Sequence, residues 1–177
     1  MRMTFPICGI DVGIRKSVMA ALEGNRLVYL GDPRGKCAIC GVDAPLTRGS
    51  EPFRDCDREI LRMSIRLYPV SMGFMKELHH NALRIVHGGI CAYVFEVYPH
   101  ATRRLLGFGY SKRDASGRRR IEEALKQFVN LGSYRNLNAD QLDAIASALT
   151  VMLFLEGKAR CVGRECRILL PSLVNSP

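Results

Sequence analysis

Acidic side chains stand where apolar segments of this sequence end or begin. Asp11 ends an apolar run that starts at residue 5, Asp43 ends a second run, and Glu96 lies within a third. Asp140 and Asp143 open a long apolar segment, and their spacing places them on one face of a helix. Buried carboxylates that converge repel one another strongly unless cations lie between them. Carboxylate oxygens are the ligands that Mg²⁺ and Mn²⁺ prefer. The predicted ligands of such a cation are Asp11, Glu96, Asp140 and Asp143.

The chemistry that such a site supports is attack of metal-activated water on a phosphodiester. Two divalent ions about 3.5–4 Å apart serve this reaction in two-metal sites. Structural interpretations stay open beside it: Asp11 as a turn residue, Asp43 as the cap of a loop, and Glu96 as the partner of a buried arginine. Asp140 lies in a first helical turn, where the helix dipole favours any acidic residue. The candidate catalytic residues are Asp11, Asp43, Glu96 and Asp143.

The basic residues of the chain are concentrated in one segment. The formal net charge is +9, and residues 101–120 alone contribute +6, from seven basic side chains against Asp114. Such a segment suits a polyphosphate partner, because each neutralised phosphate releases a condensed counterion. A solvated basic loop is the alternative. The predicted nucleic-acid contacts are Arg103, Arg104, Lys112, Arg113, Arg118, Arg119 and Arg120.

The elements that must position these residues follow from the hydrophobic pattern. Three short apolar runs joined by turn-type sequence predict antiparallel strands at 5–12, 17–22 and 27–30. Two further runs, 37–42 and 91–97, are apolar on both faces and separated by helical sequence, which favours parallel pairing. Helices are predicted at 55–67, 74–86, 99–106, 116–131 and 138–156, before a hairpin at 160–170. The expected fold is one α/β domain over 1–177: a mixed five-stranded sheet, three antiparallel strands then two parallel, with helices on both faces.

Seven cysteines are present. The pair Cys37 and Cys40 has CxxC spacing without a second matching pair, which argues against a zinc site. Cys161 and Cys166 flank Gly163, where a type II′ turn would place the two cysteines opposite each other at disulfide distance. Whether that bridge forms depends on the redox poise of the compartment.

The sequence predicts no membrane span. The longest uncharged stretch near the C-terminal half, 144–155, is shorter than the roughly 20 apolar residues that cross a bilayer. We therefore expect a cytoplasmic protein.

Several motifs carry a resemblance to known proteins. Residues 9–13 resemble the opening of the ribonuclease H-like superfamily, and 140–149 are similar to the last helix of RuvC-type Holliday-junction resolvases. The chain resembles more closely a family of predicted nucleases of that fold, catalogued as a domain of unknown function. The matched segments are 9–13, 42–46, 54–58, 95–100, 112–117 and 142–148.

This resemblance implies a ribonuclease H-like fold and divalent cations held by Asp11, Asp143 and either Asp43 or Glu96. The choice between Asp43 and Glu96 stays open. The resemblance also marks Arg54, Asp57 and His100 as family positions without an assigned role.

The leading functional hypothesis is a metal-dependent nuclease that acts on DNA or RNA. One alternative is a non-catalytic nucleic-acid-binding module of the same fold. Another is an actin-like or sugar-kinase-like ATP-binding domain, because Asp-x-Gly also opens that fold. Repulsion within the acidic cluster predicts that Asp143→Asn abolishes cleavage and leaves the fold as stable or more stable.

Overall fold

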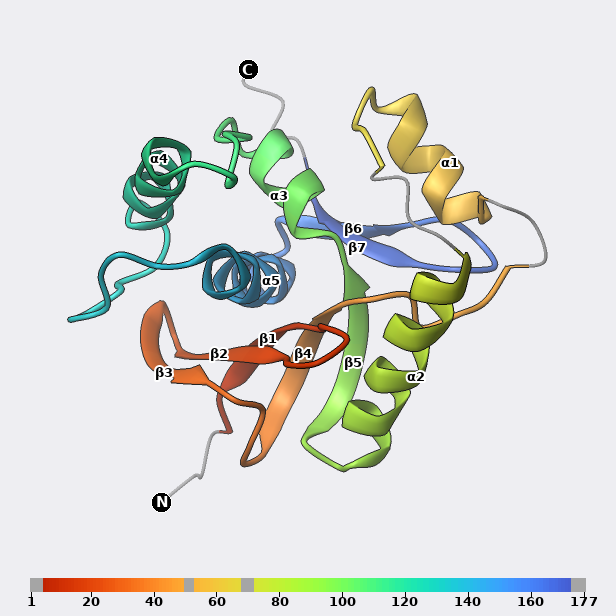
Figure 1. Cartoon of the computed structure of the whole chain (residues 1–177), viewed down its shortest axis with the longest axis horizontal. Coiled ribbons are helices and arrows are strands. Elements are labelled where there is room, and N and C mark those ends of the chain that lie inside the picture. The colour runs from red at the N-terminus through yellow and green to blue at the C-terminus, as the bar shows by residue number, and fades with distance from the viewer. Residues whose placement is uncertain (1–4, 50–52, 68–71, 173–177) are drawn as a thin grey trace.

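The seven-stranded sheet at the centre of the molecule has the strand order β3-β2-β1-β4-β5-β7-β6 (Figure 1). This is a computed structural model, and it describes residues 5–49, 53–67 and 72–172. The α/β class and the mixed sheet are those that the sequence predicts. The predicted number of five strands is wrong, because the C-terminal hairpin joins the sheet as two more strands.

The first five strands have the predicted directions. β2 pairs antiparallel with both β1 and β3, whereas β4 pairs parallel with β1, and β5 with β4. The carboxyl ends of β1, β4 and β5 therefore meet at one edge of the sheet. Their bounds are β1 Ile7–Asp11, β2 Val18–Glu23, β3 Arg26–Gly31, β4 Cys37–Asp43 and β5 Cys91–Val97.

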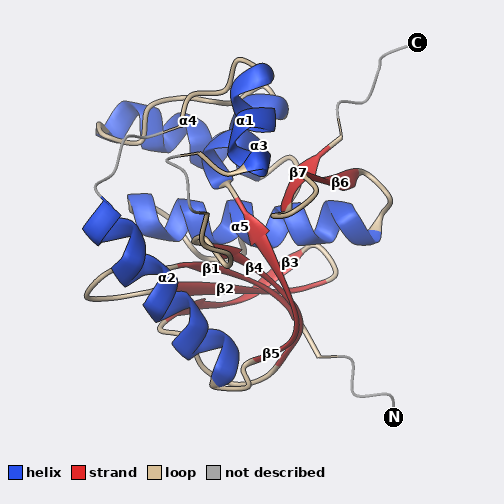
Figure 2. Cartoon of the chain, turned by 90° about the vertical axis from the view of Figure 1, so that its right-hand side faces the viewer, coloured by secondary structure: helices blue, strands red, loops and turns tan. Residues whose placement is uncertain are grey.

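Helices cover both faces of the sheet, as predicted. Figure 2 shows α2 and α5 on opposite sides of the strands. Two apolar clusters reflect this arrangement: one packs β1–β3 against α4 and α5, and the other packs β1 and β4 against α2. None of the helices within the described ranges is long and apolar enough to cross a membrane. Their bounds are α1 Asp55–Arg62, α2 Met72–His87, α3 Pro99–Leu105, α4 Ala115–Leu125 and α5 Ala139–Leu155.

Helix α5 lies unusually close to the sheet because glycines face it. A Cβ atom built on Gly9 would lie 2.1 Å from the carbonyl oxygen of Ala144, so no larger residue fits there. A Cβ on Gly41 of β4 would lie 2.7 Å from the carbonyl oxygen of Ser147. Asp143 immediately precedes Ala144, the residue that faces Gly9. The close packing therefore brings the Asp143 side chain to the carboxyl ends of β1 and β4.

Two helices end earlier than the sequence predicts. The helix predicted at 116–131 ends at Leu125, because the following residues return to the sheet: the Leu27 amide donates to the Asn130 carbonyl at 2.9 Å. The helix predicted at 55–67 ends at Arg62, and Ser64 takes a left-handed φ of 57° that turns the chain.

The C-terminal hairpin consists of β6 (Ala159–Val162) and β7 (Ile168–Pro171), which pairs parallel with β5. Its turn spans 163–167, so Cys161 lies opposite Leu169 and not opposite Cys166. The predicted two-residue turn is therefore wrong. Cys166 instead forms a disulfide with Cys56 of α1.

Asp55, the first residue of α1, explains the long turn. Its carboxylate accepts hydrogen bonds from the backbone amides of Arg164, Glu165 and Cys166, the last two at 2.9 and 3.1 Å. These hydrogen bonds hold the pKa of Asp55 well below its usual range. The turn is thus shaped around a carboxylate more than 100 residues earlier in the chain.

Candidate functional site

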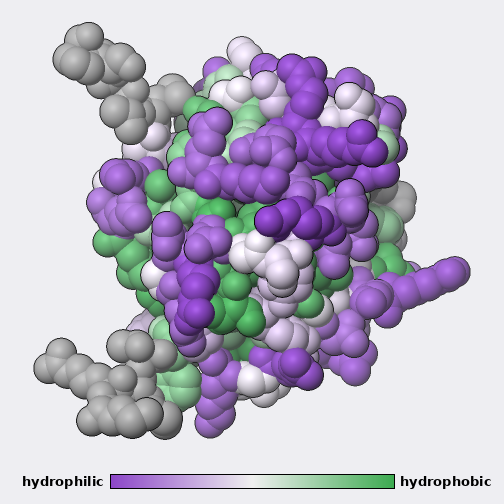
Figure 3. Space-filling view, turned by 90° about the vertical axis from the view of Figure 1, so that its left-hand side faces the viewer, coloured by the Kyte–Doolittle hydropathy of each residue, from purple (hydrophilic) through white to green (hydrophobic). Residues whose placement is uncertain are grey.

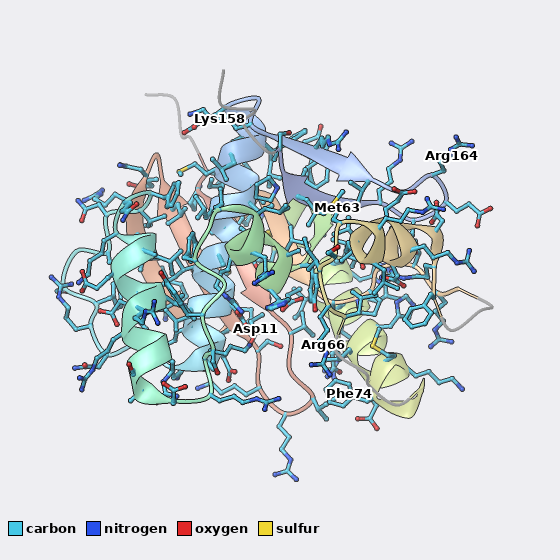
Figure 4. All side chains as sticks on the ribbon, turned by 90° about the horizontal axis from the view of Figure 1, so that it is seen from above. Asp11, Met63, Arg66, Phe74, Lys158 and Arg164 are labelled. Atoms are coloured by element: carbon cyan, nitrogen blue, oxygen red, sulfur yellow. A yellow bond between two sulfur atoms is a disulfide. The ribbon has the colours of Figure 1, made fainter. Side chains whose placement is uncertain are left out.

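Three aspartates from three elements converge at the carboxyl ends of the central strands. Asp11 ends β1 and Asp43 ends β4, and the parallel register makes them direct neighbours. Asp143 reaches them from the first turns of α5, and one carboxylate oxygen of each residue lies within 4.8 Å of the other two. Figure 4 shows Asp11 beside α5. We call Asp11, Asp43 and Asp143 the acidic triad.

Asp143 already forms ion pairs with two basic side chains. Its Oδ1 accepts a hydrogen bond from Arg103 of α3, and its Oδ2 accepts one from Lys112. The side chains of Asp143 and Arg103 are almost fully buried, whereas that of Lys112 is 32% exposed. Arg103 is therefore a fixed internal counterion, and Lys112 is the one that can move toward solvent.

Asp11 and Asp43, the other two members of the acidic triad, have raised pKa values. Burial, followed by the charge of Asp140, raises the pKa of Asp11 to about 6. Burial, followed by the charge of Asp11, raises the pKa of Asp43 to about 8. Arg103 and Lys112 oppose both shifts without cancelling them. Near neutral pH, the triad thus holds fewer negative charges than it has carboxylates, and an added cation would favour full ionisation.

The acidic triad fits a hard divalent cation in its donor chemistry. It offers carboxylate oxygens only, and Mg²⁺ and Mn²⁺ prefer such ligands. The oxygens already lie close enough that small side-chain movements would bring them onto one ion. Lys112 must leave Oδ2 of Asp143 for that oxygen to become a ligand, which its partial exposure permits.

Glu96 takes a different position from the one that the metal-site hypothesis gives it. It lies opposite Val42 in the sheet, so its side chain shares the α2 face with Val42 and points away from the acidic triad. There it accepts two hydrogen bonds from Arg54, at 2.6 and 2.9 Å, and one from the Leu46 amide at 2.8 Å. The alternative interpretation, a carboxylate paired with a buried arginine, describes its contacts.

Arg54 and Asp57, matched family positions in the sequence, belong to this same ion network. Asp57 accepts hydrogen bonds from the Arg54 guanidinium at 3.0 Å. Arg54 also donates to the Thr47 carbonyl at 3.2 Å. Through Leu46 and Thr47, the network fixes the segment that follows Asp43.

Asp140 stands at the rim of the site. It lies in the first turn of α5, which begins with a reciprocal pair of hydrogen bonds between Asn138 and Gln141. Its side chain is exposed, and it is not among the carboxylates of the triad. Its charge nevertheless reaches Asp11 and raises that pKa.

Most of the predicted nucleic-acid contacts lie on the surface beside the site, around α4. Arg118 donates to the carbonyls of Lys112 and Arg113, each at 3.1 Å, and so fixes the basic loop, residues 107–114 between α3 and α4. The Arg120 guanidinium stacks on Tyr110, 3.7 Å from the ring centre. Figure 3, which views the side that carries α4, shows hydrophilic residues across its upper half. Arg103 is the exception, since it is 1% exposed and pairs with Asp143.

His100 lies on α3 and is half-buried, with its ring 5.8 Å from that of Tyr98. Burial, followed by the charge of Arg103, lowers its pKa to about 4. The imidazole is therefore neutral near pH 7.

The sequence groups Arg103 and Lys112 with the other basic residues of 101–120, as surface charges, and does not identify them as partners of the acidic triad. A signal existed only for Lys112, which opens the family-matched segment 112–117. Nothing in the local sequence separates the buried Arg103 from the exposed Arg104 beside it.

The chain is similar to a described protein family and to a solved structure. A family model described as "Protein of unknown function (DUF429)" matches residues 71–166. The structure of T. thermophilus RuvC in complex with a Holliday junction substrate is similar to this chain, with a TM-score of 0.47 and 14% sequence identity. That alignment covers 86% of this chain and 96% of the RuvC chain. No curated protein matches the sequence.

Proposed function

This chain belongs to the DUF429 family of proteins of unknown function, and from its own geometry we propose that it is a metal-dependent nuclease of ribonuclease H-like fold. The observation that carries the proposal is the convergence of Asp11, Asp43 and Asp143 at one strand edge. Three buried or half-buried carboxylates whose oxygens lie within 4.8 Å of one another are a costly arrangement for a site that never binds a cation.

The acidic triad would hold the cation, Mg²⁺ or Mn²⁺. Asp11 and Asp43 offer oxygens from the strand ends, and Asp143 offers Oδ2 once Lys112 has left it. Arg103 keeps Asp143 oriented from the buried side through Oδ1. When bound, such a cation supplies activated water and neutralises charge on a phosphodiester. Glu96 would have an indirect role, because Glu96 and Arg54 together fix the segment that follows Asp43 and so help to position that carboxylate.

The substrate that the neighbouring surface fits is a nucleic-acid backbone. The exposed basic residues around α4 present positive charge, and the Arg120 guanidinium stacks on the Tyr110 ring beside them. Phosphate contacts position a protein on nucleic acid but carry no sequence information. Binding of DNA or RNA by shape and charge is therefore the proposed mode. The predicted phosphate contacts are Arg104, Lys112, Arg113, Arg118, Arg119 and Arg120.

A second candidate function is a nucleic-acid-binding module that does not cut. The observation that favours it is the pairing of Asp143 with both Arg103 and Lys112, which neutralises one carboxylate of the acidic triad without a metal ion. In this case the acidic triad serves as an internal ion-pair network, and Lys112 stays on Asp143 when nucleic acid binds.

Cleavage assays with single-stranded, duplex and branched DNA and RNA separate these candidates. Each substrate is incubated with Mg²⁺ or Mn²⁺, and then with EDTA. Asp43→Asn should abolish cleavage, whereas the control Asp32→Asn should retain it, because Asp32 is exposed and pairs with the exposed Lys16.

The possible outcomes of this assay are distinct. Metal-dependent cleavage that Asp43→Asn removes supports the nuclease. Tight binding without cleavage under either metal supports the binding module. Neither binding nor cleavage of any substrate contradicts both.

A further inference from the structure

Four of the seven cysteines form one buried group at the opposite end of the strands from the acidic triad. Cys8 lies near the start of β1, Cys37 and Cys40 lie on β4, and Cys91 begins β5. All four are at most 9% exposed, and all belong to the apolar cluster that packs against α2. They form two disulfides, Cys8–Cys37 and Cys40–Cys91. We call these residues the cysteine quartet.

The quartet is a single cluster and not two separate bridges. In the parallel ladders, Cys8 lies directly opposite Cys40, and Cys37 lies directly opposite Cys91. The disulfides join the other pairs, so each cysteine is bonded to one member and next to another in the sheet. The sulfur atoms of Cys8, Cys37 and Cys40 lie within 4.8 Å of one another, and Cys91 is bonded to Cys40.

These separations suit a tetrahedral metal site once the disulfides are reduced. Zinc–sulfur bonds of about 2.3 Å place the sulfur atoms of a tetrahedral site roughly 3.8 Å apart. The bonded sulfurs must move apart on reduction to van der Waals distance, while the sulfur of Cys40 already lies within 4.8 Å of those of Cys8 and Cys37. Cys91, which is bonded to Cys40, must turn toward the other two. The CxxC spacing of Cys37 and Cys40 is one that zinc sites use. The second pair that the sequence lacks is supplied by Cys8 and Cys91, from two other strands.

We propose that the reduced cysteine quartet binds one Zn²⁺-class ion as a four-thiolate site. Reduction of each disulfide takes two electrons from a dithiol reductant, which itself becomes a disulfide, and leaves two thiols. Binding of the ion then releases four protons from the four thiols. Unpaired thiolates are costly in an apolar core, so the thiolates and the ion appear together.

The consequence is a cross-link that survives a change of redox conditions. Under oxidising conditions, two disulfides tie β1 and β5 to β4. Under reducing conditions, one metal ion would tie the same three strands. The far ends of two of these strands carry Asp11 and Asp43, so the register that makes those carboxylates neighbours is kept in both states.

Cobalt binding to the reduced chain of residues 1–177 tests the proposal. The protein is reduced with a phosphine, the phosphine is removed without oxygen, and Co²⁺ is added. We expect one Co²⁺ per chain with the intense absorption of tetrahedral thiolate ligation, and displacement by Zn²⁺. Oxygen ligation at the acidic triad gives no sulfur charge-transfer band, so this readout is independent of the proposed nuclease.

Three variants make the assignment specific. Cys40→Ser should lower cobalt affinity by more than the roughly 10–100-fold that changes around a metal ligand cause. Cys161→Ser should bind like the wild type, because Cys161 is outside the quartet. The double variant Cys56→Ser with Cys166→Ser removes the cysteine pair that lies beside Asp55, outside the quartet. It should also bind cobalt like the wild type.

Two results would overturn the proposal. One is the absence of the thiolate band in the reduced wild type, and the other is an unchanged band in Cys40→Ser. If the reduced chain unfolds, far-ultraviolet circular dichroism decides, since added Zn²⁺ should restore the fold of the wild type but not of Cys40→Ser. Failure of Zn²⁺ to restore the wild-type fold counts against the site.

Discussion

Removal of one carboxylate from the acidic triad should have opposite effects on stability at two of its positions. Asp143→Asn removes the carboxylate that pairs with Arg103, whose side chain is buried at 1% exposure. Removal of one member of a buried ion pair costs about 3–5 kcal/mol. Loss of the second ion pair, to Lys112, adds little to this cost, because the Lys112 side chain can turn to solvent. We therefore expect Asp143→Asn to lower the free energy of unfolding by about 3 kcal/mol or more.

Asp43→Asn should instead raise the free energy of unfolding. The pKa of Asp43 rises from 3.8 to about 8 on folding, so folding at pH 7 requires proton uptake. At 1.36 kcal/mol per pKa unit, this uptake costs up to about 4 kcal/mol at pH 7. The neutral amide avoids that cost, and a gain of about 1–4 kcal/mol is expected.

The pH dependence fixes the sign of the second effect. A carboxyl whose folded pKa is raised has no penalty below its unfolded pKa, and it loses stability as pH rises toward the folded pKa. The advantage of Asp43→Asn should therefore be absent near pH 4 and grow until about pH 8. Guanidinium unfolding, followed by circular dichroism in EDTA at several pH values, measures both variants against the wild type.

Two results would refute these expectations: an Asp143→Asn variant as stable as the wild type, or an Asp43→Asn variant less stable than the wild type at pH 8. The sequence alone predicts no loss of stability for Asp143→Asn, because it shows converging acids and not the cations between them. The position of Arg103 reverses that expectation. The same Asp143 variant should still lack cleavage activity if the proposed nuclease is correct.

Three further predictions follow from the ion networks and the basic surface. Arg54→Gln leaves Glu96 buried without its guanidinium partner and should lower the free energy of unfolding by about 3–5 kcal/mol. The control Arg62→Gln breaks an exposed ion pair and should change that free energy by less than about 0.5 kcal/mol. Equal effects of the two variants in guanidinium unfolding would contradict the buried network. Mn²⁺ affinity, measured by calorimetry, should rise between pH 6 and pH 9, because protons compete with the metal at Asp11 and Asp43. The pKa values of these aspartates are raised to about 6 and about 8. A flat profile would show that they are not ligands. Arg119→Glu should weaken binding of all nucleic-acid sequences alike and reduce the slope of log affinity against log salt by about one, and an unchanged slope would remove this residue from the interface.

Much of the fold was predictable because its signals are local. The strand periodicity, the turn-type sequence between the first strands and the apolar fifth helix each predicted an element of the structure at or near its position. Two of the three carboxylates in the triad, Asp11 and Asp43, are the last residues of their strands. In parallel strands such positions share an edge, so their proximity follows from topology.

The remainder depended on register and long-range contacts that local sequence does not record. Glu96 and Asp43 both lie near strand ends, but a one-residue difference in register places Glu96 on the opposite face. Cys166 pairs with Cys56 because backbone amides of the turn before β7 donate hydrogen bonds to the Asp55 carboxylate. No spacing rule links residues so far apart in the sequence. The burial of Arg103 likewise depends on how α3 packs against α5.

The Cys56–Cys166 disulfide also makes a large covalent ring of the polypeptide. The ring contains Glu96, Arg103, Lys112 and Asp143, which come from β5, α3, the basic loop and α5. In the chain-entropy account, closing a loop of about 100 residues contributes about 4.7 kcal/mol. The exposed Arg113 in the basic loop is an available point for trypsin. A single cut there would open the ring and leave both pieces joined through the disulfide. The nicked chain would therefore migrate as one molecule on a denaturing gel and separate into two bands only after reduction.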